Sequence, residues 1–157
     1  MTETLGVISD THGLLRPEAL AALQGCTRIV HAGDVGSAEV LSCLRDIAPT
    51  IAVRGNVDHG AWALALPVAK VVEFEDHKIY VRHIFDEIDV VPSEEGLSAV
   101  IYGHSHKPSI AHEGGVLYLN PGSAGPRRFK LPLTVAKMWV ADGKLVAKLI
   151  ELDVAAA

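Results

Sequence analysis

The sequence is poor in residues that mark several classes of protein. Aromatic side chains make up 5% of the 157 residues, and only two cysteines occur, Cys26 and Cys43. They lie on separate segments, so the chain has no CxxC motif of the kind used in metal or redox sites. We interpret both as buried thiols near helices, as expected in a reducing cytoplasm.

Long apolar runs and an excess of basic residues are also missing. The apolar runs are far shorter than the ~20 residues of a membrane span, and residues 1–4 are polar without a basic region. The formal net charge of −5 predicts no broad basic surface for nucleic acid. We therefore expect a cytoplasmic protein without a membrane span or a stable nucleic-acid complex. A small charged substrate held inside one pocket remains compatible with this charge.

The remaining composition is that of a globular protein. Apolar residues make up 49% and charged residues 21%, and 157 residues suffice for one sizeable core but not two. The first third alternates strand and helix patterns, with strands expected at 5–9, 28–32 and 51–53. Helices are expected from Pro17 to about Gly25 and after Ser37. We predict a single domain over residues 1–157.

The second half is predicted to consist mainly of strands, at 69–74, 78–82, 99–102, 116–119, 134–140 and 145–152. Asp142-Gly143 is a strong hairpin signal. Several short strands end in loops that begin with Asp, His, Asn or Gly. Because ligand sites in α/β sheets gather outside the carboxyl ends of strands, these loops are expected to converge.

Seven side chains in or beside such loops are candidate metal ligands: Asp10, His12, Asp34, Asn56, His83, His104 and His106. Imidazole combined with carboxylate and amide oxygen suits zinc, iron, manganese or nickel better than calcium. Each piece alone is weak, because a single histidine is usually a surface residue or a satisfied core residue. The order D-x-H, G-D, G-N, H, G-H-x-H is far more specific than any of its parts.

This order resembles the calcineurin-like metallophosphoesterase family, and the short chain is similar to its small bacterial and archaeal phosphodiesterases. The resemblance runs from Asp10 to at least Ser123. It implies an α/β (α+β) fold, a two-sheet β-sandwich flanked by helices in four αββα layers. It further implies that Asp10, His12 and His106 bind one metal, that Asn56, His83 and His104 bind the other, and that Asp34 bridges the two.

The implied activity is hydrolysis of phosphodiester, or else phosphomonoester, bonds in a small phosphoester substrate by a hydroxide that two divalent metal ions activate. Manganese is the favoured metal, with iron, nickel or zinc as alternatives. Asp34 and Asn56 are the catalytic residues under this reading, together with His59. A scaffold that has lost catalysis, as in a subunit of the retromer coat, and a nuclease are the competing interpretations. Relatives often form oligomers, so a homodimer or homotetramer is a further prediction.

Two positions depart from the family. Many members carry histidine directly after Gly-Asn, where this chain has Val57, which cannot transfer a proton. Asp58 and His59 are the nearby substitutes, and we expect substrates with stabilised leaving groups, such as aryl esters or nucleotides, to react faster than alkyl esters. After His83, Ile84-Phe85-Asp86 replaces the usual glycine and changes the loop beside the site.

Three further features allow two readings each. Residues 120–123, Asn-Pro-Gly-Ser, form either a structural turn beneath the site or a substrate contact. Arg127, Arg128 and Lys130 either neutralise a phosphate tail of the substrate or are solvated. His31 either orients a ligand or is a satisfied buried histidine.

Overall fold

The computed structural model describes residues 3–128 and 130–154. Met1 and Thr2, which belong to the polar N-terminal segment considered above, lie outside the described residues. No helix within the described ranges is long and apolar enough to cross a membrane.

The first sheet contains five strands in the order β10-β9-β1-β2-β3. Its parallel part comprises β1 (Leu5–Ile8), β2 (Arg28–His31) and β3 (Thr50–Ala52), while β9 (Thr134–Ala141) runs antiparallel to β1. The partner of β9 is β10 (Lys144–Glu151). The turn between them holds Asp142 and Gly143 at φ +52° and +77°, the two positive values that a type I′ hairpin requires.

The second sheet also contains five strands, in the order β4-β5-β6-β8-β7. Three of them are parallel and central, namely β5 (His77–Arg82), β6 (Ala99–Ile101) and β8 (Val116–Asn120). The antiparallel strands β4 (Ala69–Phe74) and β7 (Ser109–Glu113) form its edges. The predicted two-sheet sandwich is therefore confirmed.

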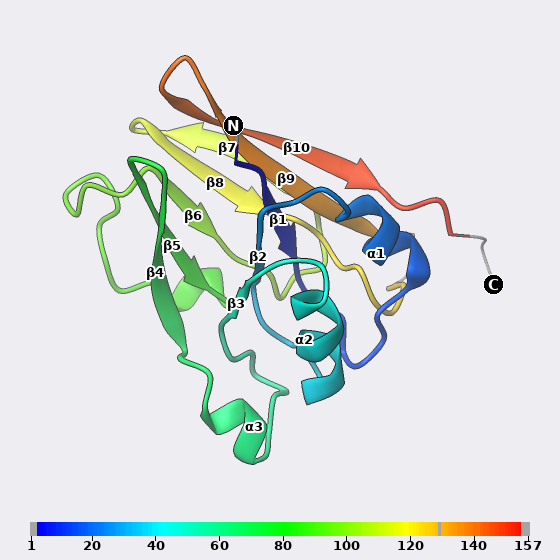
Figure 1. The fold of residues 1–157 in the computed structure, drawn as a ribbon. Coiled ribbons are helices and arrows are strands. Elements are labelled where there is room, and N and C mark those ends of the chain that lie inside the picture. The colour runs from blue at the N-terminus through cyan, green and yellow to red at the C-terminus, as the bar shows by residue number, and fades with distance from the viewer. Residues whose placement is uncertain (1–2, 129, 155–157) are drawn as a thin grey trace.

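The sheets face each other across an apolar core to which both contribute, including Val7 and Val30 from the first sheet and Val81 and Ile101 from the second. The other face of the first sheet is covered by α1 (Pro17–Ala22) and α2 (Ala38–Arg45), which lie together in Figure 1. The outer face of the second sheet is covered by the short 3₁₀ helix η1 (Phe85–Glu87) and residues 88–97, since Leu97 packs there with neighbouring strand residues.

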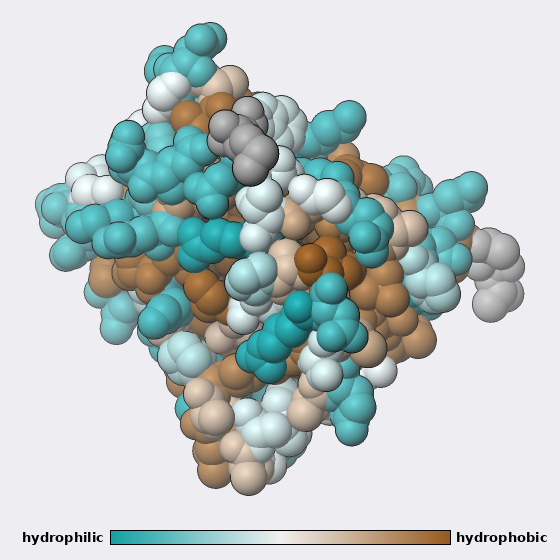
Figure 2. Space-filling model, in the orientation of Figure 1, coloured by the Kyte–Doolittle hydropathy of each residue, from teal (hydrophilic) through white to brown (hydrophobic). Residues whose placement is uncertain are grey.

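The sequence did not predict three elements, η1, α3 (Ala61–Leu64) and β7. Figure 2 shows apolar surface over α3, where Leu64 is 72% exposed. The prediction that both cysteines are buried is wrong for Cys43, which lies on the solvent side of α2, whereas Cys26 is buried. Helical spacing places Leu41 and Leu44 inward and turns position 43 outward.

Five strands point their carboxyl ends toward the same region of the molecule (Figure 1). Asp10 follows β1, Asp34 follows β2 and Asn56 follows β3. From the second sheet, His83 follows β5 and His104 follows β6. The site therefore lies where the loops of both sheets meet.

Candidate metal centre

Two groups of three side chains form where these loops meet. The first group is Asp10, His12 and His106, and the second is Asp34, His83 and His104; within each, the ligand atoms lie within 4.8 Å of one another. The groups are adjacent, since His12 Nε2 lies 3.6 Å from Asp34 Oδ2. Six of the seven predicted ligands are thus brought together.

The carboxylates of Asp10 and Asp34 each have one oxygen that accepts hydrogen bonds from the protein and one that faces the histidines. Asp10 Oδ2 accepts hydrogen bonds from Ser9 Oγ (2.7 Å) and the His104 backbone N–H (3.1 Å), leaving Oδ1 3.3 Å from His106 Nε2. Asp34 Oδ1 accepts from the Val57 backbone N–H (3.1 Å), and its Oδ2 lies 3.0 Å from His83 Nε2. The Ser9 hydroxyl and two backbone N–H groups therefore direct both carboxylates into the space between the imidazoles.

His83 is oriented by its other ring nitrogen. Its Nδ1 lies 2.9 Å from the carbonyl oxygen of Ala32, which only accepts, so Nδ1 carries the proton. Nε2 is then the nitrogen left to bind a metal ion, and it faces Asp34. Such a bond from the far side of the ring is the usual way in which proteins orient a metal-binding histidine.

The centre contains buried polar atoms that have no hydrogen-bond partner among the described residues. They are Asp10 Oδ1, His12 Nε2, His83 Nε2 and both ring nitrogens of His106. Buried polar atoms in folded proteins are almost always paired, so a cluster of unpaired ones calls for a ligand. Nitrogen and carboxylate oxygen that converge in this way fit a borderline divalent metal.

The carboxylates and imidazoles of the centre shift each other's pKa values. Burial alone would raise the pKa of Asp10, but His106 and His12 outweigh burial and hold that pKa well below its usual range. Burial likewise opposes ionisation of Asp34, whose pKa is nevertheless lowered by His83. The pKa of His12 is raised, chiefly by Asp10, with Arg128 acting in the opposite direction. Both carboxylates are therefore kept ionised beside the imidazoles, as metal binding requires.

The backbone at the candidate ligands is itself unusual. Five of them adopt left-handed φ values between +48° and +73°: Asp10, His12, Asp34, His104 and His106. Non-glycine residues rarely adopt this region, and clusters of such residues occur at functional sites. The conformation allows two side chains to leave one short loop in the same direction.

Three glycines let the loops approach closely enough. A Cβ on Gly33 would lie 2.8 Å from the Cβ, Cγ and Nδ1 of His83. One on Gly103 would collide with Ser9 and Asp10, and one on Gly55 would collide with Asp34. Glycine is required at these positions because neighbouring loops occupy the space of a side chain.

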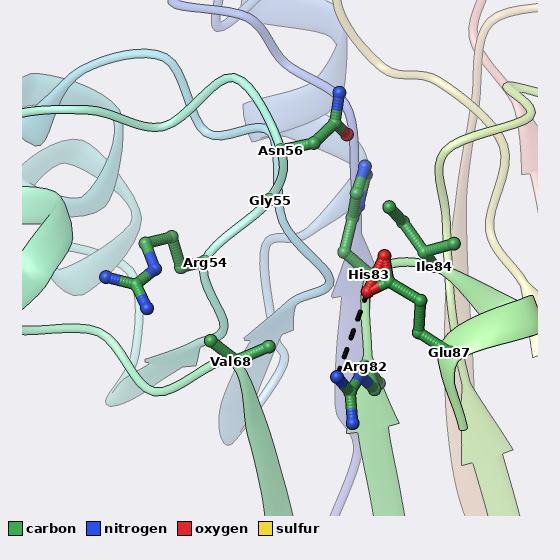
Figure 3. A pocket seen from close by; sticks show the side chains of 8 residues that line it. All are labelled: Arg54, Gly55, Asn56, Val68, Arg82, His83, Ile84 and Glu87. Atoms are coloured by element: carbon green, nitrogen blue, oxygen red, sulfur yellow. Dashed lines mark ion pairs between the residues drawn. The ribbon is translucent and has the colours of Figure 1, made fainter. Parts of the chain in front are cut away.

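The other predicted site residues are placed less centrally. Asn56 is exposed, and its side chain extends on the same side as the His83 imidazole (Figure 3). His59 is exposed and belongs to neither group. The Asp58 carboxylate is buried and accepts hydrogen bonds from the backbone N–H groups of Val35 (3.2 Å), Gly36 (2.9 Å) and Gly55 (2.8 Å). Its suggested role as a proton donor is wrong, because the carboxylate holds two loops together instead.

His31 is a satisfied buried histidine that also supports the site. Its Nδ1 accepts the Gly33 N–H (3.1 Å), so the protonated Nε2 donates to Thr11 Oγ1 (2.9 Å). Thr11 Oγ1 in turn donates to Val35 O (2.8 Å). These bonds join the loop that carries Asp10 to the loop that carries Asp34. Thr11 was not identified from the sequence, because a threonine between two candidate ligands carries no signal of its own.

The turn at residues 120–123 lies beneath the site, as its structural reading expected. Asn120 is buried, and its side-chain amide donates to Gly103 O (3.2 Å) and Ser105 Oγ (3.1 Å). Ser123 Oγ donates to Asp10 O (3.0 Å). The turn thereby supports the loops of both groups from below.

Cavities flank the centre on both sides. Figure 3 shows one of about 120 Å³ beside the second group, lined by the side chains of Val68 and Ile84 and by the ion pair between Arg82 and Glu87 (3.8 Å), among others. The other flank has a cavity of about 210 Å³ lined by His12, His106, Pro126, Arg127 and Arg128. Both groups of candidate ligands can therefore be reached from outside.

Comparisons with known proteins agree with this geometry. A sequence model of the calcineurin-like phosphoesterase superfamily domain matches residues 4–143. The chain is 37% identical to a probable metallophosphoesterase of Methanocaldococcus jannaschii, over 97% of this chain and 83% of that protein. A solved archaeal phosphodiesterase is 25% identical with a TM-score of 0.79, covering 95% of this chain and 99% of that one. Vps29 of Chaetomium thermophilum, 19% identical over 96% of this chain and 97% of that one, shares the fold with a TM-score of 0.77.

The buried neutral His31 predicts a loss of stability in acid. Burial lowers its pKa from 6.5 to about 4. Between these values the unfolded chain binds more protons than the folded one, so the free energy of unfolding falls as pH falls, by about 3 kcal/mol in total. In His31→Asn, whose Oδ1 can still accept the Gly33 N–H, this contribution disappears. Urea unfolding of both chelated proteins at several pH values measures it, and equal pH slopes would contradict the assignment.

The contact between Gly33 and His83 predicts a selective defect in Gly33→Ala. The added Cβ must displace the imidazole, so we expect the variant to bind roughly one equivalent less manganese than the wild type. Gly25→Ala is the matched control, because Gly25 has a similarly positive φ of +87° but no atom within 4 Å of the added Cβ. Both substitutions cost about 1–2 kcal/mol of backbone strain. Equal metal content in the two variants would show that the contact is unimportant.

Proposed function

Since the chain belongs to the calcineurin-like phosphoesterase superfamily, we propose that it hydrolyses phosphodiester bonds with the help of two divalent metal ions. The observation that carries the proposal is the cluster of buried, unpaired ligand atoms on Asp10, His12, His83 and His106. A protein that never bound cations there would leave these atoms unsatisfied at a considerable cost. Phosphomonoesters are the second substrate class to test.

We assign Asp10, His12 and His106 to one ion and His83, His104 and Asn56 to the other. The bridging role proposed for Asp34 is supported by the position of its Oδ2, 3.0 Å from His83 Nε2 and 3.6 Å from His12 Nε2. We propose manganese as the first metal to test, with iron, nickel and zinc as alternatives that the same ligands accept.

Two divalent ions at this centre would lower the pKa of water toward neutrality and offset the charge of a phosphate group. The chain's part is to hold the ligands at the meeting point of five strands and to keep their ionised carboxylates in place. Ser9, the His104 N–H and the Val57 N–H supply that support through hydrogen bonds to Asp10 and Asp34. His59 remains the candidate proton donor for the leaving group, from the exposed rim of the site.

A scaffold without catalysis is the competing proposal. The likeness to Vps29 supports the fold alone, because the identity is only 19%. The enzyme reading is favoured by the six converging ligand side chains, which a scaffold would not need. A nuclease is disfavoured by the net charge of −5. We further propose that the chain is one domain in the cytoplasm; a dimer or tetramer stays a prediction.

Asp34→Asn tests the metal-dependent mechanism. The substitution removes the carboxylate charge of the proposed bridging ligand and is expected to lower manganese binding. Phosphodiester hydrolysis should fall by at least about 100-fold, because mutating even a residue that only hydrogen-bonds to a metal ligand typically lowers metal affinity or activity 10–100-fold. Turnover of bis(p-nitrophenyl) phosphate and metal content are measured together. The control is His112→Ala, an exposed histidine on β7. Full activity in Asp34→Asn, or hydrolysis by chelated wild type, would disprove the mechanism.

The apolar side chain of Val57 predicts a dependence on the leaving group. We expect the p-nitrophenyl ester of methyl phosphate to react at least about 10-fold faster than the phenyl ester, because no strong acid protonates the departing oxygen. Val57→His should narrow this difference, since the Val57 side chain is exposed and its hydrogen bond to Asp34 comes from the backbone N–H, which the substitution keeps. Val57→Asn controls for polarity without a titrating ring. Equal rates on both esters in the wild type would refute the prediction.

A further inference from the structure

The cavity on the flank of His12 and His106 has a basic wall. Its volume of about 210 Å³ is lined by these two candidate ligands together with Pro126, Arg127 and Arg128. A group bound there would touch the first ligand group and a guanidinium at the same time. The proposed function does not use this cavity.

The loop that carries the arginines is fastened to the metal centre. Ser123 Oγ donates to Asp10 O (3.0 Å) and lies 3.2 Å from Pro126 O, while Arg16 Nε donates to Gly125 O (2.9 Å). Gly125 approaches Thr11 so closely that a Cβ would collide with the Thr11 backbone. The backbone that leads to Arg128 is therefore fixed relative to the loop of Asp10 and His12.

The arginines near the centre differ in whether their guanidinium groups have hydrogen-bond or ion-pair partners. Arg127 donates to Val154 O (3.1 Å), and on the opposite flank Arg82 pairs with Glu87 (3.8 Å) and Asp89 (3.7 Å). Arg54 directs its guanidinium away from His83 (Figure 3). Arg128 is exposed, and its guanidinium has no hydrogen bond or ion pair within residues 3–128 and 130–154.

We propose that this cavity binds a second phosphate of the substrate, held by Arg128 and supported by Arg127, while the ester phosphate lies at the metal centre. A planar guanidinium binds phosphate oxygens through two parallel hydrogen bonds, which suits it to this role. The inference rests on the proposed function and narrows it to phosphoesters that carry an additional phosphate, such as a nucleotide ester phosphorylated at a neighbouring hydroxyl. An acidic protein surface does not hinder such a substrate, because the charge is met locally.

A matched pair of substrates tests the subsite. Thymidine 5′-(p-nitrophenyl phosphate) and its 3′-phosphorylated form differ only in the second phosphate. With manganese and at constant ionic strength, the wild type is expected to prefer the 3′-phosphorylated substrate by about 10-fold in kcat/KM, the value of one hydrogen-bonded charge pair. In Arg128→Gln the ratio of the two kcat/KM values is expected to fall to about 1, whatever happens to the common rate.

Arg45→Gln is the control for charge. Arg45 is an exposed arginine at the carboxyl end of α2, and its removal changes the net charge equally but should keep the preference. Two results overturn the inference: no preference in the wild type, or a preference that Arg128→Gln retains. The second result includes an equal loss of kcat/KM on both substrates in Arg128→Gln, which would assign Arg128 to the ester phosphate instead.

A binding measurement separates this inference from the proposed function. If the manganese-loaded wild type hydrolyses neither substrate, the proposed function fails, but calorimetry can still compare thymidine 5′-phosphate with thymidine 3′,5′-bisphosphate. The subsite predicts about 10-fold tighter binding of the bisphosphate to the wild type, and the loss of that advantage in Arg128→Gln. Equal affinities of the wild type for the two nucleotides would reject the subsite independently of catalysis.

Discussion

Asp10 and Asp34 must stay charged although the protein buries them, and much of the surrounding structure serves this requirement. An ionised carboxylate loses several kcal/mol of hydration on burial unless hydrogen bonds and opposite charges replace the water. For Asp10 the replacements come from Ser9 directly after β1, from the loop after β6 and from two imidazoles. For Asp34 they come from the loop after β3 and from His83. Both sheets must therefore send loops to one point.

Bringing so many loops together has a conformational cost. Left-handed backbone at five candidate ligands costs on the order of 1 kcal/mol for each residue, and the sandwich core must offset it. Close contacts then prevent relaxation, since Gly33 touches the ring of His83 and Gly103 touches Ser9. His31, Asp58 and Ser123 add hydrogen bonds between loops that are distant in the sequence. The candidate ligands are thus held in place before any metal arrives, which is how preorganised sites gain affinity.

The sequence predicted those parts of this arrangement that depend on local patterns. Buried strands, the Asp142-Gly143 hairpin and the loops with paired ligands were found because periodicity and turn chemistry act over a few residues. The edge strand β7 was missed, since four of its five residues are exposed and show no alternation. The four-residue α3 is too short for helical spacing to register.

The centre itself was predicted unevenly for a related physical reason. The pairs Asp10/His12 and His104/His106 can be recognised in the sequence, because in each pair two ligands lie in one loop. His83 stands alone, and only the parallel pairing of β5 with β6 brings it beside His104. The role of Asp58 was predicted wrongly because it also depends on residues distant in the sequence. Two of the three N–H groups that donate hydrogen bonds to its carboxylate lie in a loop more than twenty positions away.

Under the proposed function, the same constraint limits how the leaving group can be protonated. Three groups beside the candidate ligands offer no proton: the Asp58 carboxylate accepts hydrogen bonds between two loops, His31 is kept neutral by burial, and Val57 presents only an apolar side chain. The proposed proton donor, His59, lies at the rim, where it is exposed to water and has no hydrogen-bond partner among the described residues to set its orientation. A donor so weakly positioned gives little assistance to a poor leaving group. If the chain hydrolyses phosphodiesters as proposed, the rate of bond cleavage would therefore depend mainly on how stable the leaving group is once it departs.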